Sequence, residues 1–167
     1  MMLRTIVTYP DDILRGKAKQ IENIDGSVIT LAEDMAETMY LSRGIGLAAP
    51  QIGVQSCLIV ADIGNELIEL YNPMIIAAER AFVAQEGCLS VPDIMLEIER
   101  AEKVVVEGIN REGKKVTLEA EDLLARVLQH EIDHLQGTLI IDHASRIQRQ
   151  LISGRLKKLH RQRKDKT

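Results

Sequence analysis

The residues of this chain whose spacing could do chemistry lie in the segment His130-Glu131-Ile132-Asp133-His134. Two histidines four residues apart share one face of a helix, so both imidazoles can bind the same metal ion. Glu131 beside them can take a proton from a metal-bound water, which indicates hydrolysis. The same HExxH spacing also occurs in ordinary helices, so the motif indicates an enzyme only if further ligands accompany it.

A catalytic metal site of this type needs a third protein ligand and one open coordination position. Zinc peptidases with HExxH take the third ligand from downstream, but the metzincin continuation does not follow His134 here. Upstream, Cys88 lies beside Gly87 in a predicted loop or strand edge, where a thiolate is well suited to metal binding. Cys57 lies within an aliphatic run, and we interpret it as an inert buried residue.

The elements that must position these residues predict an α+β fold, with mostly antiparallel sheets packed around the HExxH helix and a C-terminal helix. Hydrophobic spacing predicts helices at about 27–41, capped by Asp25 or Ser27, at 121–136, stopped by Gly137, and from Ile147 to Leu159. A glycine-rich loop is expected over 44–53. Strands are expected at 57–61, around 67–71, 81–84 and 94–98, and in a hairpin of 103–107 with 115–119.

Composition favours a single domain over residues 1–167 with an aliphatic core, because hydrophobic residues make up 46% and aromatic residues 2%. So few aromatic rings argue against recognition of single-stranded nucleic acid by stacking. No apolar run reaches the roughly 18 residues of a membrane span, and the N-terminus does not read as a signal peptide. Two cysteines make no disulfide framework, so we expect a reducing cytoplasm.

Basic residues are concentrated at the end of the chain. Segment 145–167 holds nine of the 21 Lys and Arg residues but one of the 25 Asp and Glu residues, which leaves an acidic remainder. An acidic body with a basic tail predicts a polyanionic partner. The alternative is a solvated helix whose apolar stripe packs on the body.

Three segments in this order resemble the motifs of the peptide deformylase family. They are Gly44-Ile-Gly-Leu-Ala-Ala-Pro-Gln51, Glu86-Gly-Cys-Leu-Ser90 and Gln129-His-Glu-Ile-Asp-His-Leu-Gln-Gly137, and the likeness extends from about residue 3 to 160. The resemblance implies a bacterial-type enzyme that removes the formyl group from the N-terminal formyl-methionine of new proteins. It departs at Met95, where some members place an arginine near the substrate.

The resemblance also implies the metal site. It makes Cys88, His130 and His134 the ligands of one divalent ion, for which the family's physiological choice is Fe²⁺. Zn²⁺, Ni²⁺ or Co²⁺ can occupy the same place, and a site with two nitrogens and one sulfur is compatible with all four ions.

Catalytic and substrate-binding roles follow from the same likeness. Glu131 acts as general base and then general acid, while the Gln51 side chain and the Leu89 backbone N–H stabilise the oxyanion. Backbone groups around Ile45 and Gly46 pair with the peptide's main chain. We expect Ile45, Leu123 and Val127 to form the apolar pocket for the methionine side chain.

Other polar residues near the motifs have two interpretations each. Glu86 could support the metal loop or be a solvated acid. Asp133 could fix a ligand or bridge to Arg100, or form an ordinary surface ion pair. His143 and His160 fall outside the three motifs.

For partners, the resemblance implies nascent formyl-methionyl polypeptides and suggests the ribosome, since some members dock on it through a basic C-terminal helix. A monomer in a bacterial cytoplasm is the expectation. A zinc peptidase and an RNA-binding module with a structural Cys/His₂ site are the competing functions. The second of these needs a fourth ligand, for which Cys57 is the other cysteine.

Overall fold

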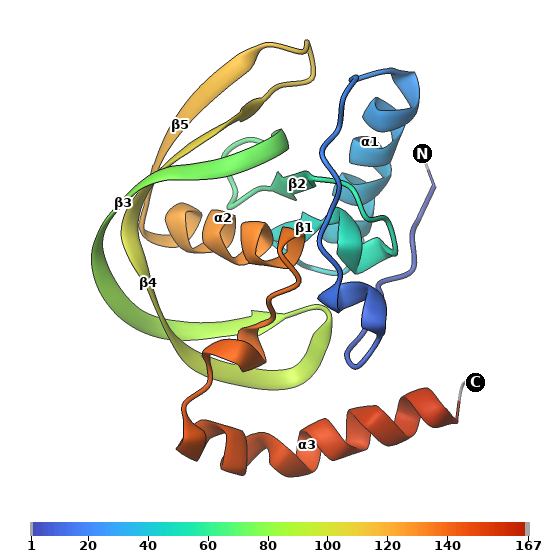
Figure 1. Ribbon diagram of the computed structural model, residues 1–167, viewed down its shortest axis with the longest axis vertical. Helices are drawn as coiled ribbons and strands as arrows, with labels where there is room; N and C mark the ends of the chain where they lie inside the picture. Colours follow the sequence, from blue (N-terminus) through green and yellow to red (C-terminus); the bar gives the residue numbers. More distant parts are fainter. Residues whose placement is uncertain (1, 166–167) are drawn as a thin grey trace.

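The computed structural model, which describes residues 2–165, contains an antiparallel sheet curved around a central helix (Figure 1). Three helices accompany the sheet: α1 (Gly26–Leu41), α2 (Asp122–Leu135) and α3 (Arg146–Lys164). The strands, in their order across the sheet, are β1 (Gly46–Ala48), β2 (Leu58–Ala61), β3 (Ile68–Cys88), β4 (Val91–Ile109) and β5 (Lys115–Glu121). The predicted α+β class with mostly antiparallel pairing around the HExxH helix is confirmed.

β3 and β4 form one long bent ribbon, which the sequence prediction wrongly divided into short strands around 67–71, 81–84 and 94–98. Pairing runs with bulges from Tyr71 opposite Ile109 to Cys88 opposite Val91. The stretch 77–81, Ala-Ala-Glu-Arg-Ala, has low strand propensity and is mostly exposed, so it gives no local signal. Its backbone is ordered by hydrogen bonds to β4 instead. The predicted hairpin between β4 and β5 is confirmed.

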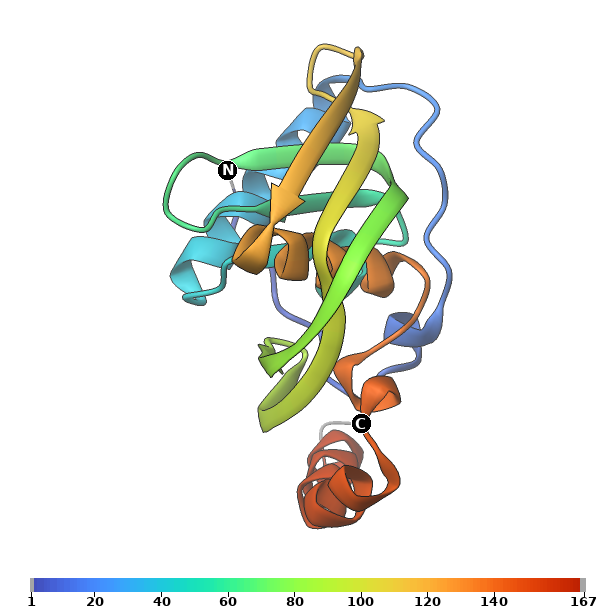
Figure 2. The ribbon, with the colours of Figure 1, turned by 90° about the vertical axis from the view of Figure 1, so that its left-hand side faces the viewer.

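Helix α2 fills the concave side of the sheet. Its buried Ala125, Val127, Leu128 and Leu135 pack with residues of β2, β4 and β5 in a single aliphatic cluster. The view in Figure 2 shows β3, β4 and β5 crossing in front of the helix. Burial of this apolar stripe leaves the face with His130 and His134 directed toward the end of β3.

The segment 44–53, predicted as a loop, is more regular than expected. It forms β1, paired with β2, and then a 3₁₀ turn, η2 (Ala49–Ile52). Both are buried against α1, which is capped by the Asp25 side chain as predicted. The backbone is ordered here because burial would leave its polar groups unpaired in a loose loop.

Helix α3 lies across the outer end of the β3–β4 ribbon (Figures 1 and 2). Ile152, Leu156 and Leu159 pack on the body, whereas Ile147 and Leu151 are 70% and 78% exposed. The predicted apolar stripe is therefore split between two faces. Two 3₁₀ turns, η1 (Asp12–Arg15) and η3 (Ile140–His143), complete the elements. Over residues 2–165, no helix is both long and apolar enough to cross a bilayer.

Candidate active site

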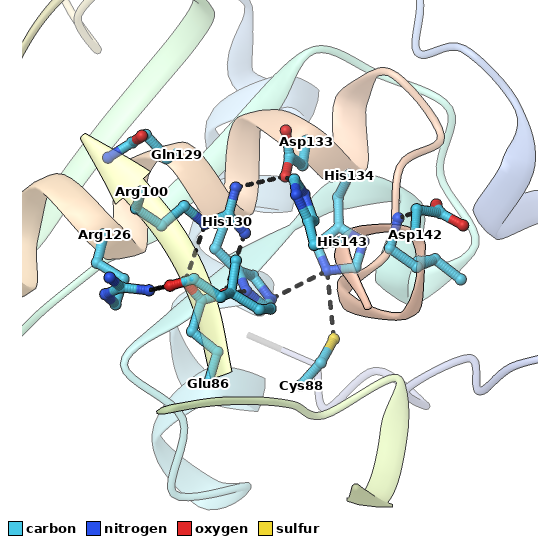
Figure 3. Close-up of polar contacts among 12 residues, drawn as sticks. Glu86, Cys88, Arg100, Arg126, Gln129, His130, Asp133, His134, Asp142 and His143 are labelled. Carbon is cyan, nitrogen blue, oxygen red and sulfur yellow. Dashed lines mark hydrogen bonds and ion pairs between the residues drawn. The ribbon is translucent and has the colours of Figure 1, made fainter. Parts of the chain in front are cut away.

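Three side chains of metal-binding type converge between the end of β3 and the C-terminal half of α2 (Figure 3). The His134 Nε2 atom lies 3.3 Å from Cys88 Sγ and 3.3 Å from His130 Nε2. Donor atoms at about 2.0–2.3 Å from one tetrahedral ion are roughly 3.3–3.6 Å apart, so the spacing fits a single metal ion. Among the described residues this is the one such group, and the donors suit Fe²⁺ or Zn²⁺.

Secondary structure explains why these residues meet. His130 and His134 lie one turn apart on α2. Cys88 ends β3 at an irregularity in the pairing between Glu86 and Cys88, where the ribbon turns back into β4. The bulge changes the local direction of the strand, and the thiol thereby points at the helix.

Glu86 connects this group to the surrounding protein. One carboxylate oxygen accepts from His130 Nδ1 at 2.9 Å and from Arg100 at 3.0 Å. The other accepts from Arg100 Nε at 2.9 Å and from Arg126 at 2.7 Å. The supporting role for Glu86 is thus confirmed over the solvated one, because the residue is buried and all its acceptor sites are used.

The charge on these residues is set by their contacts. Burial opposes ionisation of Glu86, but its bonds to His130 and Arg100 hold the pKa of the carboxyl well below its usual range. Burial also opposes a charge on His130, yet bonds to Cys88 and Glu86 raise its pKa well above the ordinary value. Burial and the neighbouring His130 lower the pKa of His134, which favours the neutral imidazole that binds metals.

Glu131 lies in a closed environment beside β1. Its side chain is buried, and burial raises the pKa of its carboxyl to about 7. The Oε2 atom is buried without a hydrogen-bond partner in the part of the chain that the structure describes. A Cβ at Gly46 would clash with the Glu131 carboxylate and lie 2.8 Å from Val127 Cγ1. Glycine at this position is what allows β1 and α2 to approach so closely.

Gln51 lies beside Cys88, and Leu89 follows Cys88 in the chain. The Gln51 Oε1 atom accepts from the Ala48 backbone N–H at 2.8 Å, which fixes the amide. Its Nε2 donates to Ser90 Oγ at 3.2 Å and lies 3.6 Å from Cys88 Sγ. The Gln51 donor and Leu89 both line the same pocket as Cys88 and Glu131.

A pocket of about 590 Å³ opens beside these residues. The predicted residues Ile45, Leu123 and Val127 all line it, together with Gly46 and Met95. Val127 is buried, while Ile45 and Leu123 are 43% and 48% exposed, so the apolar wall extends from the interior to the mouth. The structure thus brings every predicted site residue except His134 to the wall of one pocket, with His134 directly behind it.

The positions of Asp133 and Cys57 decide between the interpretations that the sequence left open for them. Arg100 donates to Asp133 Oδ2 at 2.6 Å, which confirms that bridge, and His143 joins it from the outside at 2.8 Å. Cys57 packs in the aliphatic core, and burial raises the pKa of its thiol. It is outside the metal-binding group, so residues 2–165 form no site closed by four protein ligands.

Arg126 is the residue that sequence reasoning missed. It lines the pocket with its guanidinium bonded to Glu86. The sequence feature that could have indicated its role is a cationic side chain four residues before His130, on the same helix face. Such spacing is common on solvated helices, and only the fold shows that this arginine is buried.

Comparison with known proteins agrees with this geometry. The family model for polypeptide deformylase matches residues 3–150. A peptide deformylase of Syntrophomonas wolfei is 50% identical over 144 residues, which cover 86% of this chain and 95% of that protein. One from Thermodesulfovibrio yellowstonii is 46% identical over 162 residues, covering 94% and 98%.

Solved structures give the same result at the level of the fold. The crystal structure of a peptide deformylase from Legionella pneumophila matches with a TM-score of 0.90 and 44% identity, covering 97% of this chain and 98% of that one. With the match of the family model over most of the sequence, these likenesses show that the chain belongs to the polypeptide deformylase family and is a peptide deformylase, an enzyme that removes the formyl group from N-terminal methionine.

Proposed function

We propose that this deformylase hydrolyses formyl-methionyl peptides at the group formed by Cys88, His130 and His134, with Glu131 as proton carrier. The observation that carries the proposal is the convergence of these three donors within 4.8 Å of one another, with Cys88 and His130 on the wall of an apolar pocket. When bound there, a divalent metal supplies a Lewis acid that activates water and polarises the formyl oxygen. We propose Fe²⁺ as that ion, with Zn²⁺, Ni²⁺ or Co²⁺ as substitutes.

Glu131 is proposed as general base and then general acid. Its unpartnered Oε2 is free to accept a proton from the attacking water and to deliver it to the leaving amine. Gly46 lies against the carboxylate and leaves no room for it to move toward β1. Because the environment is dry, the proton is passed to the substrate instead of to bulk solvent.

Stabilisation of the oxyanion is proposed for the Gln51 amide and the Leu89 backbone N–H. Gln51 is fixed by its bond from Ala48, so its Nε2 donor is oriented before the reaction begins. We further propose that backbone groups around Ile45 and Gly46 pair with the peptide, and that Leu123, Val127 and Ile45 receive the methionine side chain. A formyl group is the smallest acyl group, and so the closed end of the pocket would exclude larger acyl groups.

The test is release of formate from formyl-Met-Ala-Ser by metal-loaded protein. Glu131→Ala should lower kcat by about 10²–10⁴-fold, the usual contribution of a positioned acid–base group. Glu119→Ala is the matched control, because the Glu119 side chain is 71% exposed and pairs with Lys103. Full activity of Glu131→Ala, or no formate from correctly metallated wild type, contradicts the mechanism.

We also propose that α3 docks the enzyme on ribosomal RNA. Its exposed face carries basic side chains, including Lys157 and Lys158, with the exposed Ile147 and Leu151 on the same helix. The double substitution Lys157→Glu/Lys158→Glu should weaken ribosome binding and flatten its salt dependence. The same reversal at Lys114 and Lys115, exposed in the β4–β5 hairpin, should change neither. Equal effects of the two reversals would rule out a specific role for α3.

Residues 1–167 are proposed to work as one domain and as a monomer. Because the proposed substrate is a nascent formyl-methionyl chain, we propose that the enzyme acts in the bacterial cytoplasm. Sedimentation of the metal-loaded protein tests the monomer.

A further inference from the structure

We propose that Arg126 is a positioning residue of the metal site. It ties the helix with the two histidines to the ribbon with Cys88, and it acts through Glu86. The inference rests on the proposed function only in that it concerns the same ligands.

Arg126 makes bonds in three directions from a buried position on α2. Its guanidinium donates to Glu86 Oε1 at 2.7 Å, to the Ile98 carbonyl at 3.0 Å and to the Phe82 carbonyl at 3.0 Å. The guanidinium carbon also lies 4.6 Å from the centre of the Phe82 ring. The side chain is 6% exposed, so its loss would remove donors from a buried carboxylate and from two strand carbonyls.

These partners lie on the stretch of ribbon that ends at Cys88. Phe82 and Glu86 belong to β3, and Ile98 lies opposite Ala84 on β4. Arg126 itself is one helical turn before His130, whose Nδ1 contacts the same carboxylate. One side chain therefore fixes both strands against the helix turn that leads to the first histidine. Figure 3 shows its contact with Glu86.

Charge and position predict opposite effects if Arg126 is removed. The network around Glu86 holds two carboxylates, Glu86 and Asp133, and two guanidiniums, Arg100 and Arg126. Removing one guanidinium leaves an excess negative charge, which by Coulomb attraction would tighten the binding of a cation. Removing the hydrogen bonds of Arg126 lets Glu86 and the ribbon shift. The shift would misplace Cys88 and His130 and weaken metal binding. The sign of the change separates the two roles.

The experiment compares Arg126→Met with Arg111→Met in the full chain. Methionine keeps much of the aliphatic stem and removes every donor. Arg111 is the control, because its guanidinium is also held by carboxylate groups, those of Glu33 and Glu69, but outside the site. The readouts are the Co²⁺ dissociation constant by competition with a chelator, the visible spectrum of bound Co²⁺, and thermal unfolding.

We expect Arg126→Met to bind Co²⁺ about 10- to 100-fold more weakly, with altered Co²⁺ bands, and Arg111→Met to match wild type in both. Unchanged or tighter binding by folded Arg126→Met would overturn the proposal. If that variant does not fold, Arg126→Lys keeps the charge but not the forked geometry, and it should still bind Co²⁺ more weakly. Wild-type affinity in Arg126→Lys would also overturn it. Because Co²⁺ binding is measured without substrate, failure of deformylation would not affect this test.

Discussion

Replacing Gly46 with alanine should inactivate the enzyme by displacing Glu131. The new Cβ would lie 2.9 Å from the Glu131 carboxyl carbon and 2.8 Å from Val127 Cγ1, whereas ordinary contacts are 3.4–4 Å. Gly46 does not have a positive φ, so the substitution acts through contact and not through backbone strain. Both neighbours are buried, and neither can swing into solvent.

The size of the effect follows from these distances. The Glu131 carboxylate must move by about 0.5 Å or more to restore ordinary contact with the new methyl group. Misplacement by about 1 Å typically costs about 100-fold in rate, or about 2.7 kcal/mol of transition-state stabilisation. Overpacking should also destabilise the fold by about 1–3 kcal/mol.

The assay is kcat/KM for formate release from formyl-Met-Ala-Ser, with metal content and thermal unfolding measured on the same samples. Gly154→Ala in α3 is the matched control, because its Cβ would meet nothing within 4 Å. That control should keep full activity and gain up to about 1 kcal/mol of stability, since alanine favours the helix. Wild-type kcat/KM in fully metallated Gly46→Ala would refute the reasoning.

Three further predictions concern the donor, the metal and an acid-sensitive contact. Gln51→Ala should lower kcat by about 10²–10³-fold with little change in KM, measured by formate release, because it removes a donor used mainly in the transition state. Chelation of the metal should abolish formate release and lower Tm, with recovery on adding Fe²⁺ or Co²⁺; a site filled at 100 times its Kd contributes about 2.7 kcal/mol. The bond from the Met2 backbone and the Arg4 pair outweigh burial and lower the pKa of Asp34. A lowered pKa stabilises the fold above about pH 4, and this stabilisation is lost as the pH falls through the folded pKa. Asp34→Asn should therefore lower the free energy of unfolding at pH 7 by about 1.5–3 kcal/mol, seen as a lower Tm, and should approach wild type as the pH falls below 4. A Tm difference that does not shrink as the pH is lowered through the acid range would contradict this account of Asp34.

Local sequence predicted the elements that are determined by contacts between residues close together in the chain. The apolar spacing in 121–136 and the Asp25 cap of α1 depend on contacts within a few residues, and both were found. The ribbon was missed because 77–81 has low strand propensity and is ordered by partners twenty or more residues away. The order around Gly46 was missed for the same reason, since β2 and α2 impose it.

For the site, residue types and spacing determined which chemistry was available. Two histidines at helical spacing, a glutamate between them and a cysteine beside glycine limited the chain to a few metal-dependent functions. Only the tertiary structure decided that Cys88 faces His134, that Glu86 contacts His130, and that Arg126 is buried between strands and helix. These contacts join residues about 30 to 46 positions apart, and packing of the ribbon against α2 creates them. Local sequence does not predict these contacts, because they form only when the ribbon and α2 bury their apolar faces together.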